Sequence, residues 1–337
     1  MTGQIKEKSA KMKKIENYIV DHIIEVMLIV LVLIMWIAVP NFMTVDNWLN
    51  ILNNQASKGI IAFGMTMVII CGQLDLSIGS TVALSGAIVA VFCQKFASTM
   101  TLTGACLMGM GLSFLVAAVF GIIFGSVQHK LKMPSFIVTL AAQNLVYGLA
   151  GIVCGGYPIS GVFPDWFNEI GTGHVGGPRG VSIPVIILFV VFIFSGIVMK
   201  YTTTGRSMYA VGGNQEAARL SGIHVLRSKI ICFIAVQVLA ALGGMIHSAQ
   251  VDSALQSYGR GWENDVIIST VIGGTSMNGG VGSIVGTLMG VIFLGVISNG
   301  LTIMNVSVYM QYVVKGLLMF VAVFISTWQV IRKNQES

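Results

Sequence analysis

The sequence contains few charged residues. Asp, Glu, Lys and Arg make up 9% of its 337 residues, against about 25% in a typical soluble domain. A chain of this length with so little charge cannot cover itself with a solvated surface, which excludes a cytosolic enzyme, a secreted domain and a disordered protein. Hydrophobic residues make up 55% of the chain. The composition therefore predicts an integral membrane protein.

Several chemical signatures are also absent. The five cysteines lie in apolar stretches and form no CxxC pair, so they predict neither disulfides nor a metal site. No two histidines have the spacing of metal ligands. The phosphate-binding loop GxxxxGKS or GxxxxGKT does not occur, so we expect no ATP on this chain. We expect no catalytic residue, no metal and no cofactor.

Long apolar runs take the place of the missing charge. A membrane-spanning helix needs roughly 20 apolar residues, and continuous runs argue against an alternating β-barrel. We expect an all-α polytopic membrane protein with about ten transmembrane segments, some short or broken. They lie near 23–39, 57–73, 80–96, 103–127, 134–153, 181–199, 230–247, 263–278, 281–302 and 309–330. The segment at 263–278 is short and ends in glycines, so it is either broken or re-entrant. The first segment lacks a following signal-peptide cleavage site, so we interpret it as a retained span.

The basic residues predict the direction of the chain. If the N-terminus is cytoplasmic and all ten segments cross, 14 of the 19 Lys and Arg residues fall inside, as the positive-inside rule requires. This pattern favours membrane orientation over nucleic-acid binding and predicts that both termini are cytoplasmic. The five basic residues placed outside are Lys58, Lys95, Arg179, Arg260 and Lys315.

The same topology divides the chain into parts. We expect a basic cytoplasmic segment over 1–21, one transmembrane domain over 22–331 and a cytoplasmic tail over 332–337. Within the domain, an external loop at 154–180 is rich in Gly and Pro, which predicts an irregular structured cap. A cytoplasmic loop at 200–229 is the largest basic, hydrophilic stretch between spans.

Two stretches of the sequence resemble each other. The stretches that start at Val68 and Val271 align without gaps at a constant offset of 203, and Gly79 and Gly282 are among the identical positions. Chance is the alternative, because Val, Ile, Gly and Ser are common here. Transporters built from two halves carry interrupted segments at matching positions near the substrate path. We therefore expect an internal duplication, whose copies run parallel if all ten segments cross.

Asp75 is the one acidic residue deep within the predicted spans. Such an acid costs at least roughly 2.5 kcal/mol unless it is solvated or paired. It serves either as a proton, ion or substrate site, or as a cap in which Asp75 or Ser77 accepts backbone N–H groups at the next helix start. We favour the cap, which is compatible with a role in shaping a permeation path. The candidate path residues are Gln73, Asp75, Ser77, Phe136, Asn144 and Asn278.

The cytoplasmic loop carries the most specific pattern. Glycines precede Asn214, a good N-cap, Glu216 falls in the first helical turn, and Gly222 suits a left-handed stop. This pattern predicts a helix of two turns. Ala217 and Ala218 give it a flat surface that suits insertion into a cleft of another protein. The alternative is a plain connector on the membrane surface, which needs neither paired alanines nor glycines at both ends.

The stretch from Glu216 to Gly222, EAARLSG, resembles the EAAxxxG coupling motif of ABC importer permeases. Other blocks resemble the permeases for ribose, galactose, xylose and related monosaccharides, with the ribose type nearest. These blocks are GMTMVII from Gly64, DLSIGS from Asp75, GGTSMNGGVGSIVGT from Gly273 and NGL from Asn299. The resemblance extends from about residue 40 to 325. Gln73 and Asn264 depart from the family pattern beside the translocation segments, so they leave the substrate open.

The resemblance implies partners and a mechanism. Two permease copies, identical or related, form the path in the bacterial cytoplasmic membrane. Cytosolic ABC ATPase subunits bring ATP and Mg²⁺, and an extracytoplasmic binding protein delivers the sugar. The implied ATPase-coupling residues are Gly213, Asn214, Glu216, Ala217, Ala218, Arg219, Gly222 and Arg206. The two arginines either pair with acids of the ATPase or serve only as positive-inside residues.

Other functions are open to a chain of this composition. A branched-chain amino-acid permease shares the general layout. An ion-coupled secondary carrier needs paired intramembrane ionisable residues, and an intramembrane enzyme needs clustered His, carboxylate or Cys side chains at one depth. Neither pattern is evident, so the sequence favours a monosaccharide permease.

Overall fold

The structure is a computed structural model that describes residues 23–177 and 180–336. The predicted N-terminal segment 1–21 and Arg179 lie outside the described residues. Thirteen α-helices dominate the described chain. They are α2 (Ile23–Ala38), α3 (Val45–Ile70), α4 (Ile78–Phe96), α5 (Leu102–Lys130), α6 (Ser135–Cys154), α7 (Asp165–Thr172), α8 (Ile183–Tyr201), α9 (Thr203–Gly213), α10 (Gln215–Leu220), α11 (Val225–Val251), α12 (Trp262–Ile272), α13 (Ile284–Ile303) and α14 (Val308–Glu336).

The described residues also contain two very small antiparallel sheets. The strands are β1 (Ile159–Ser160), β2 (His174–Val175), β3 (Val181–Ser182) and β4 (Ser253–Ala254). In the first sheet β1 pairs with β4, and Ile159 lies opposite Ala254. In the second, β2 pairs with β3, and His174 lies opposite Ser182.

The region predicted as an irregular cap over 154–180 contains a regular helix, α7. Pro164 precedes it and Asp165 lies in its first turn, where a carboxylate interacts favourably with the helix dipole. Phe167 is buried, and a side chain at Gly171 would overlap the backbone of α11. The helix was not predicted because the Gly and Pro residues on both sides of it give the whole segment the composition of a loop.

The apolar segments form the membrane part of the molecule. Each of the ten predicted segments carries a helix. Among the described residues, six helices are long and apolar enough to span a membrane by length and composition, namely α4, α5, α6, α8, α11 and α13. The chain is therefore an all-helical polytopic membrane protein.

Helix α3 starts earlier than its apolar run. The prediction placed this segment at 57–73, but the helix begins at Val45 and Thr44 caps it by accepting the N–H of Asn47. Its first half is rich in Asn, which lowers the hydropathy without breaking the helix. The predicted start was therefore wrong by about three turns, because hydropathy detects apolarity and not helix length.

Two helix breaks interrupt the membrane segments. The first break, residues 71–77, separates α3 from α4, and the second break, residues 273–283, separates α12 from α13. The segment predicted as broken or re-entrant at 263–278 thus ends its helix at Ile272. The breaks lie against each other, because the N–H of Gly280 donates to the carbonyl of Ile70 at 2.8 Å.

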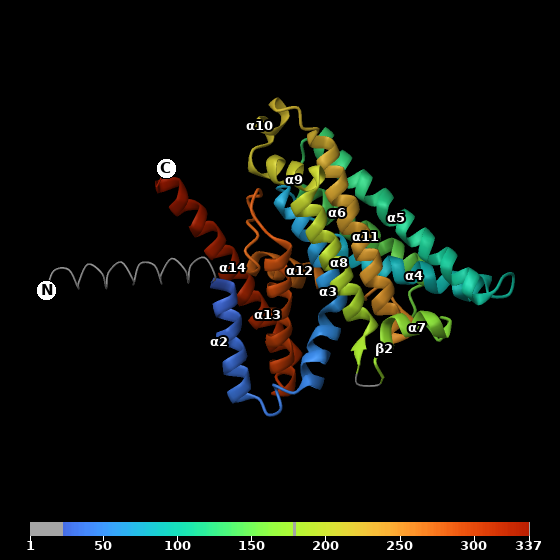
Figure 1. Ribbon diagram of the computed structural model, residues 1–337. Helices are drawn as coiled ribbons and strands as arrows, with labels where there is room; N and C mark the ends of the chain where they lie inside the picture. Colours follow the sequence, from blue (N-terminus) through green and yellow to red (C-terminus); the bar gives the residue numbers. More distant parts are fainter. Residues whose placement is uncertain (1–22, 178–179, 337) are drawn as a thin grey trace.

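Helix α11 lies at the centre of the fold. It packs against α5, α3 and α4, and Figure 1 shows it crossing the middle of the molecule between α8 and α5. A side chain at Gly121 or Gly125 of α5 would overlap the backbone of α11 at Ile234 or Ile230. Small residues at such crossings allow membrane helices to approach closely. Close backbone contact between α5 and α11 therefore contributes to the core together with the packing of large side chains.

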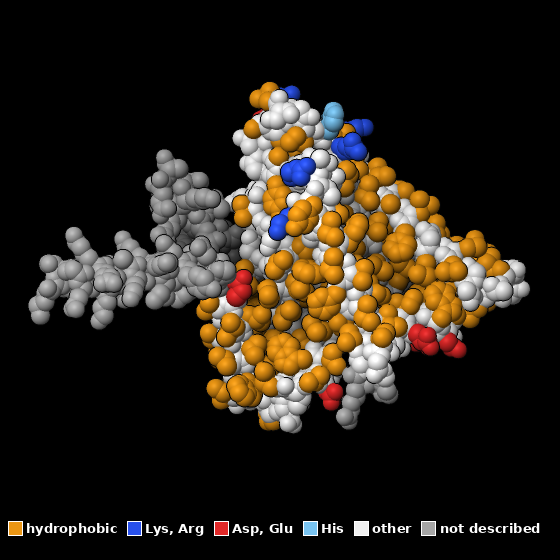
Figure 2. Space-filling model, viewed as in Figure 1, with side chains coloured by type: hydrophobic (Ala, Val, Ile, Leu, Met, Phe, Trp, Pro, Cys, Tyr) orange, Lys and Arg blue, Asp and Glu red, His pale blue; other side chains and the backbone are white. Residues whose placement is uncertain are grey.

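The two loop regions lie at opposite ends of the molecule. Figure 1 places α10 at one end and α7 with β2 at the other. The surface between them is largely hydrophobic, and the Lys and Arg side chains visible on this face gather toward the end that carries α9 and α10 (Figure 2). This distribution fits a bilayer around the middle of the molecule.

Candidate functional site

The short helix predicted in the loop at 200–229 is present as α10. The side chain of Asn214 accepts the N–H of Ala217 at 2.9 Å, which satisfies one free donor of the first turn. Glu216 lies in that first turn. Gly222 follows the helix with φ of +81°, a left-handed conformation that glycine adopts readily. The sequence folds here as its capping pattern predicts.

The side chains of α10 divide into a buried and an exposed face. Ala218 is only 4% exposed and belongs to the main hydrophobic core, so it packs within this chain. Ala217 is exposed. Leu220, at the end of the helix, is 81% exposed. The solvent-accessible surface of α10 thus presents Ala217 and Leu220. The paired alanines predicted two exposed alanines and no exposed leucine.

Two arginines were linked to the ATPase by the resemblance. Arg219 pairs with Glu216 of the same helix at 2.9 Å, and both side chains are about 70% exposed (67% and 71%). An exposed pair of this kind stabilises by about 0.2–1 kcal/mol, so both groups are free to change partners. Arg206 is exposed on α9, where its Nη1 lies 3.5 Å from the carbonyl oxygen of Tyr201.

Helix α9 connects the loop to the helix breaks. A side chain at Gly212 would overlap the carbonyl oxygen of Ile70, so glycine is required for this close packing. The hydroxyl of Tyr209 donates to the carbonyl of Gly282 at 2.8 Å. Burial raises the pKa of the Tyr209 phenol, which keeps this donor protonated to a higher pH than an exposed tyrosine. Helix α9 was not predicted, because glycine and threonine lower its helical signal.

Asp75 lies fully buried in the first break. Its Oδ1 accepts the N–H and the hydroxyl of Ser77 at 2.9 and 2.6 Å. Its Oδ2 accepts Gln237 Nε2 of α11 at 2.7 Å. Gln237 Oε1 accepts the hydroxyl of Thr81 at 2.6 Å. The carboxylate therefore bonds Ser77, the residue that precedes the first turn of α4, and ties the break to α11. Ser77 makes no side-chain cap bond to the first turn of α4, so the cap interpretation stays a prediction.

The other candidate path residues are dispersed. Gln73 is buried in the first break, and its Oε1 has no hydrogen-bond partner. Phe136 is 49% exposed in the first turn of α6. Asn278 is exposed at the second break, and Asn144 is exposed on α6. Of the six candidates, Asn144 alone lines the cavity described next.

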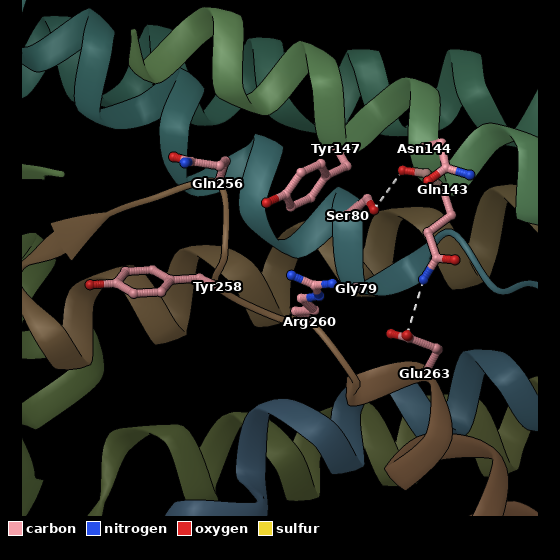
Figure 3. Close-up of a pocket in the computed structure, with 9 residues that line it drawn as sticks. All are labelled: Gly79, Ser80, Gln143, Asn144, Tyr147, Gln256, Tyr258, Arg260 and Glu263. Atoms are coloured by element: carbon pink, nitrogen blue, oxygen red, sulfur yellow. Dashed lines mark hydrogen bonds between the residues drawn. The ribbon is translucent and has the colours of Figure 1, made fainter. Parts of the chain in front are cut away.

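A polar cavity lies between α4, α6, the segment before α12 and the start of α12. Its volume is about 320 Å³, at the lower end of the range of roughly 300–1,000 Å³ for small-molecule sites. The lining residues, shown in Figure 3, are Gly79, Ser80, Gln143, Asn144, Tyr147, Gln256, Tyr258, Arg260 and Glu263. Of these lining residues, Asn144 alone was among the predicted path residues, although Gly79 and Ser80 lie in the stretch that starts at Val68 and resembles the one at Val271.

Hydrogen bonds hold part of the cavity wall in place. Ser80 donates its hydroxyl to the carbonyl of Gln143 at 2.8 Å, and Gln143 Nε2 donates to Glu263 Oε1 at 3.0 Å. These bonds, drawn in Figure 3, join α4, α6 and α12. The second carboxylate oxygen of Glu263 and the amide oxygen of Gln256 are buried without partners. The two unpartnered oxygens lie beneath the cavity surface. The lining itself offers the exposed guanidinium of Arg260, the exposed amide of Asn144 and two tyrosine side chains to a small polar solute.

One acidic residue near the cavity is fully committed to ion pairs. Asp265 of α12 pairs with Lys58 of α3 at 2.6 Å and with Lys315 of α14 at 2.9 Å, and its side chain is 11% exposed. The Lys58 ammonium also lies 5.5 Å from the ring centre of Trp262. This cluster fixes α12, whose first turn carries Glu263, between two other helices. Within the described ranges, no group of three or more His, Cys, Asp and Glu side chains is placed to hold a metal ion.

These features define a class of protein. The two helix breaks meet next to α9, which leads to the capped, exposed helix α10, and the polar cavity lies beside them. This is the arrangement of a membrane-embedded transport subunit. The family model described as "Branched-chain amino acid transport system / permease component" matches residues 47–323. The chain belongs to this family of permease components.

Three curated relatives sharpen the comparison. The ribose import permease protein RbsC of Escherichia coli (strain K12) is 38% identical over 298 residues, which cover 88% of this chain and 91% of the relative. RbsC of Bacillus subtilis (strain 168) is 39% identical over 299 residues, 88% and 90% of the two chains. The L-arabinose transport system permease protein AraH of E. coli (strain K12) is 33% identical over 293 residues, 87% and 86%. No solved structure matches the chain.

Proposed function

We propose that this chain is the membrane permease subunit of an ABC importer that brings a monosaccharide such as ribose or arabinose across the bacterial cytoplasmic membrane. The observation that carries the proposal is the match to sugar permeases over nearly the full length of both chains. As a permease component, the chain leaves ATP hydrolysis to a separate ATPase subunit, and it needs no cofactor of its own.

The polar cavity is the proposed solute site. A sugar presents hydroxyl donors and acceptors around a ring, and the cavity lining offers the Asn144 amide as donor and acceptor, the Arg260 guanidinium as a donor and two tyrosine side chains. The cavity lies beside α6, where Leu145 and Leu149 are exposed. A second permease copy packed on α6 covers these leucines and closes the path, so we infer a dimer.

Helix α10 is the proposed docking element for the ATPase. Leu220 is the apolar anchor, Ala217 permits a close approach, and the exposed Glu216 and Arg219 are free to exchange partners. Movement of α10 passes through Asn214 and Gly213 to α9, which packs on both helix breaks. The breaks in turn lead into α4 and out of α12, which line the cavity together with α6.

The direction of the chain is part of the proposal. With a cytoplasmic N-terminus and ten crossings, the loop with α10 faces the ATPase and the region with α7 faces the extracytoplasmic binding protein. The opposite positions of α10 and α7 support this assignment (Figure 1). The two helix breaks support an internal duplication, because each one separates an incoming helix from an outgoing helix in a repeated stretch.

A branched-chain amino acid is the competing solute, because the matching family description names it. Uptake of radiolabelled ribose, L-arabinose and leucine separates the two in cells that lack their own carriers and express the chain with its ATPase and binding-protein partners. We expect sugar uptake that Glu263→Gln reduces. Asp46→Asn, a change of an exposed acid in the first turn of α3, serves as the control. Leucine uptake without sugar uptake would refute the monosaccharide assignment.

The docking role of α10 has its own test. We expect Leu220→Asp to abolish co-purification of the ATPase with the permease, because a charge replaces the apolar anchor. Tyr157→Asp changes a side chain that is 77% exposed beyond the end of α6 and should leave the ATPase bound. Equal recovery of the ATPase with both variants would remove α10 from the coupling interface.

A further inference from the structure

An apolar groove lies on the flank of the molecule, apart from the polar cavity. It has a volume of about 530 Å³ and runs between the C-terminal half of α8, helix α9 and the first turn of α13. Its walls include Phe192, Ile193 and Ile197 of α8 and Ile284 and Val285 of α13. The groove is therefore lined by the same kind of side chain as the surface that faces the bilayer.

The groove continues into the lipid-facing surface. Ile193 is 57% exposed, Ile197 49% and Val285 55%, although all three are large and apolar. Aliphatic side chains exposed to this extent on a membrane helix contact lipid tails. A soluble partner has no access to the flank of α8 within the membrane, and the proposed ATPase surface lies beyond it on α10.

Two cations mark one end of the groove. Lys200, at the end of α8, and Arg206, on α9, both line it and are both exposed. The Lys200 ammonium lies 5.5 Å from the ring centre of Tyr201. No acidic residue is among the groove-lining residues, and the ion pairs found among the described residues involve neither cation. Among the side chains that the structure describes, no carboxylate therefore pairs with either cation at this end.

We propose that this groove binds one acidic phospholipid, with an acyl chain between α8 and α13 and the headgroup phosphate at Lys200 and Arg206. The shape and charge of the groove match this ligand at both ends, since a long apolar channel leads to paired cations at one membrane face. Basic pockets between membrane helices on the cytoplasmic side are established binding places for acidic headgroups. Zwitterionic lipids fit the channel equally well but gain less from the two cations.

The position of the groove gives the lipid a structural consequence. Tyr209 lines the groove and bonds to Gly282 in the second break. A phospholipid held between α8 and α13 therefore contacts the wall that joins α9 to the break. We expect occupancy to stabilise the folded protein, because a ligand that binds only the native state raises its unfolding temperature.

Native mass spectrometry of the purified full chain tests the proposal. The probes are phosphatidylglycerol and phosphatidylcholine with identical acyl chains. We expect phosphatidylglycerol to bind the wild type more tightly, by roughly tenfold or more for two cations. Lys200→Gln with Arg206→Gln should abolish this preference, whereas Arg227→Gln, an exposed cation at the start of α11, should preserve it. Equal affinity for both lipids, or a preference that survives the double change, would overturn the proposal.

A second variant tests the channel without altering charge. Gly196 lines the groove, and a Cβ placed there meets no atom within 4 Å, so Gly196→Leu fills the channel and leaves the helix backbone undisturbed. Gly111→Leu on α5 is the matched control, because its Cβ also meets nothing within 4 Å. We expect Gly196→Leu alone to reduce phosphatidylglycerol binding and to remove its stabilising shift in the unfolding temperature. Competition by inorganic phosphate at equal concentration would show that a bare anion suffices and would contradict a lipid site.

Discussion

The two helix breaks occupy corresponding places in the chain but are built differently. At the offset of 203 residues, Asp75 of the first break corresponds to Asn278 of the second. Asp75 is fully buried and accepts three hydrogen bonds from Ser77 and Gln237. Asn278 is exposed, and its one hydrogen bond within the described part of the chain runs from its backbone N–H to Ser276 Oγ at 3.3 Å. The buried Asp75 side chain therefore holds the first break, whereas the side chain at the corresponding position of the second break makes no such bonds.

Backbone packing holds the second break. Gly279, Gly280 and Gly282 all have positive φ, and the segment is attached by the Gly280 bond to Ile70 and by the Tyr209 bond to Gly282. One of these anchors belongs to α9, the helix that adjoins the docking element. The first break is thus fixed to the core through α11, and the second is fixed to the part of the molecule that we expect to move.

The largest effect is expected from removing the carboxylate of the first break. Asp75→Ala leaves the buried donors of Ser77 and Gln237 without their acceptor, which we expect to cost about 3 kcal/mol of unfolding free energy. Asn278→Ala at the corresponding position should change stability by less than about 0.5 kcal/mol. Thermal unfolding in detergent measures both. Similar losses in the two variants would mean that the breaks do not differ in this way.

An intermediate effect is expected at two glycines that share the same φ angle. Gly72 and Gly280 both have φ of +73°, so alanine costs about 1–2 kcal/mol of strain at either one. A Cβ on residue 280 would lie 2.7 Å from the Cα of Gly213, whereas on residue 72 the nearest atom is 3.8 Å away. We therefore expect Gly280→Ala to lower solute uptake more than Gly72→Ala. Equal uptake by the pair would argue against transmission through the second break.

The smallest effect is expected from one hydroxyl. Tyr209→Phe removes the bond to Gly282 and should cost about 1 kcal/mol of stability. If α9 drives the second break, it should also weaken the stimulation of ATPase activity by solute-loaded binding protein. Tyr157→Phe, which alters a largely exposed ring, is the control for the loss of a phenol. If ATPase stimulation is unchanged in the Tyr209 variant, the bond from Tyr209 to Gly282 stabilises the fold but does not transmit movement from α9 to the second break.

Much of the fold follows from local signals in the sequence. Apolar runs locate the membrane helices, and the Asn214 cap and Gly222 stop predict α10 because they act within a few residues. The polar start of α3 is invisible to hydropathy. Helix α7 carries a local signal after all, since Pro164 and Asp165 form a favourable helix start, but the surrounding glycines obscured it.

The candidate site is harder to predict because its contacts are distant in sequence. Gln237 meets Asp75 across 162 residues, and Gln143 meets Glu263 across 120. Ala218 turns inward because α9 and the core lie beneath it, which no six-residue pattern reveals. The repeat does indicate the region of the cavity, since Gly79 and Ser80 lie in it, but the partners on α6 and before α12 emerge only from packing.

The Asp265 cluster places a condition on how the protein is made. Asp265 follows Lys58 by 207 residues in the chain, and Lys315 comes a further 50 residues later. The sequence predicted Lys58 outside, but it lies within α3 (Val45–Ile70) and pairs with Asp265. During synthesis, the ribosome completes α3 long before α12 exists, so the Lys58 ammonium has to wait for its carboxylate partner. The Lys58 side chain is only 20% exposed in the folded protein, and a charge buried to this extent is costly without its partner. The final seating of α3, α12 and α14 must therefore wait for the last helix to emerge, and a chain that is cut short before α12 retains an unmatched lysine that quality-control proteases can recognise.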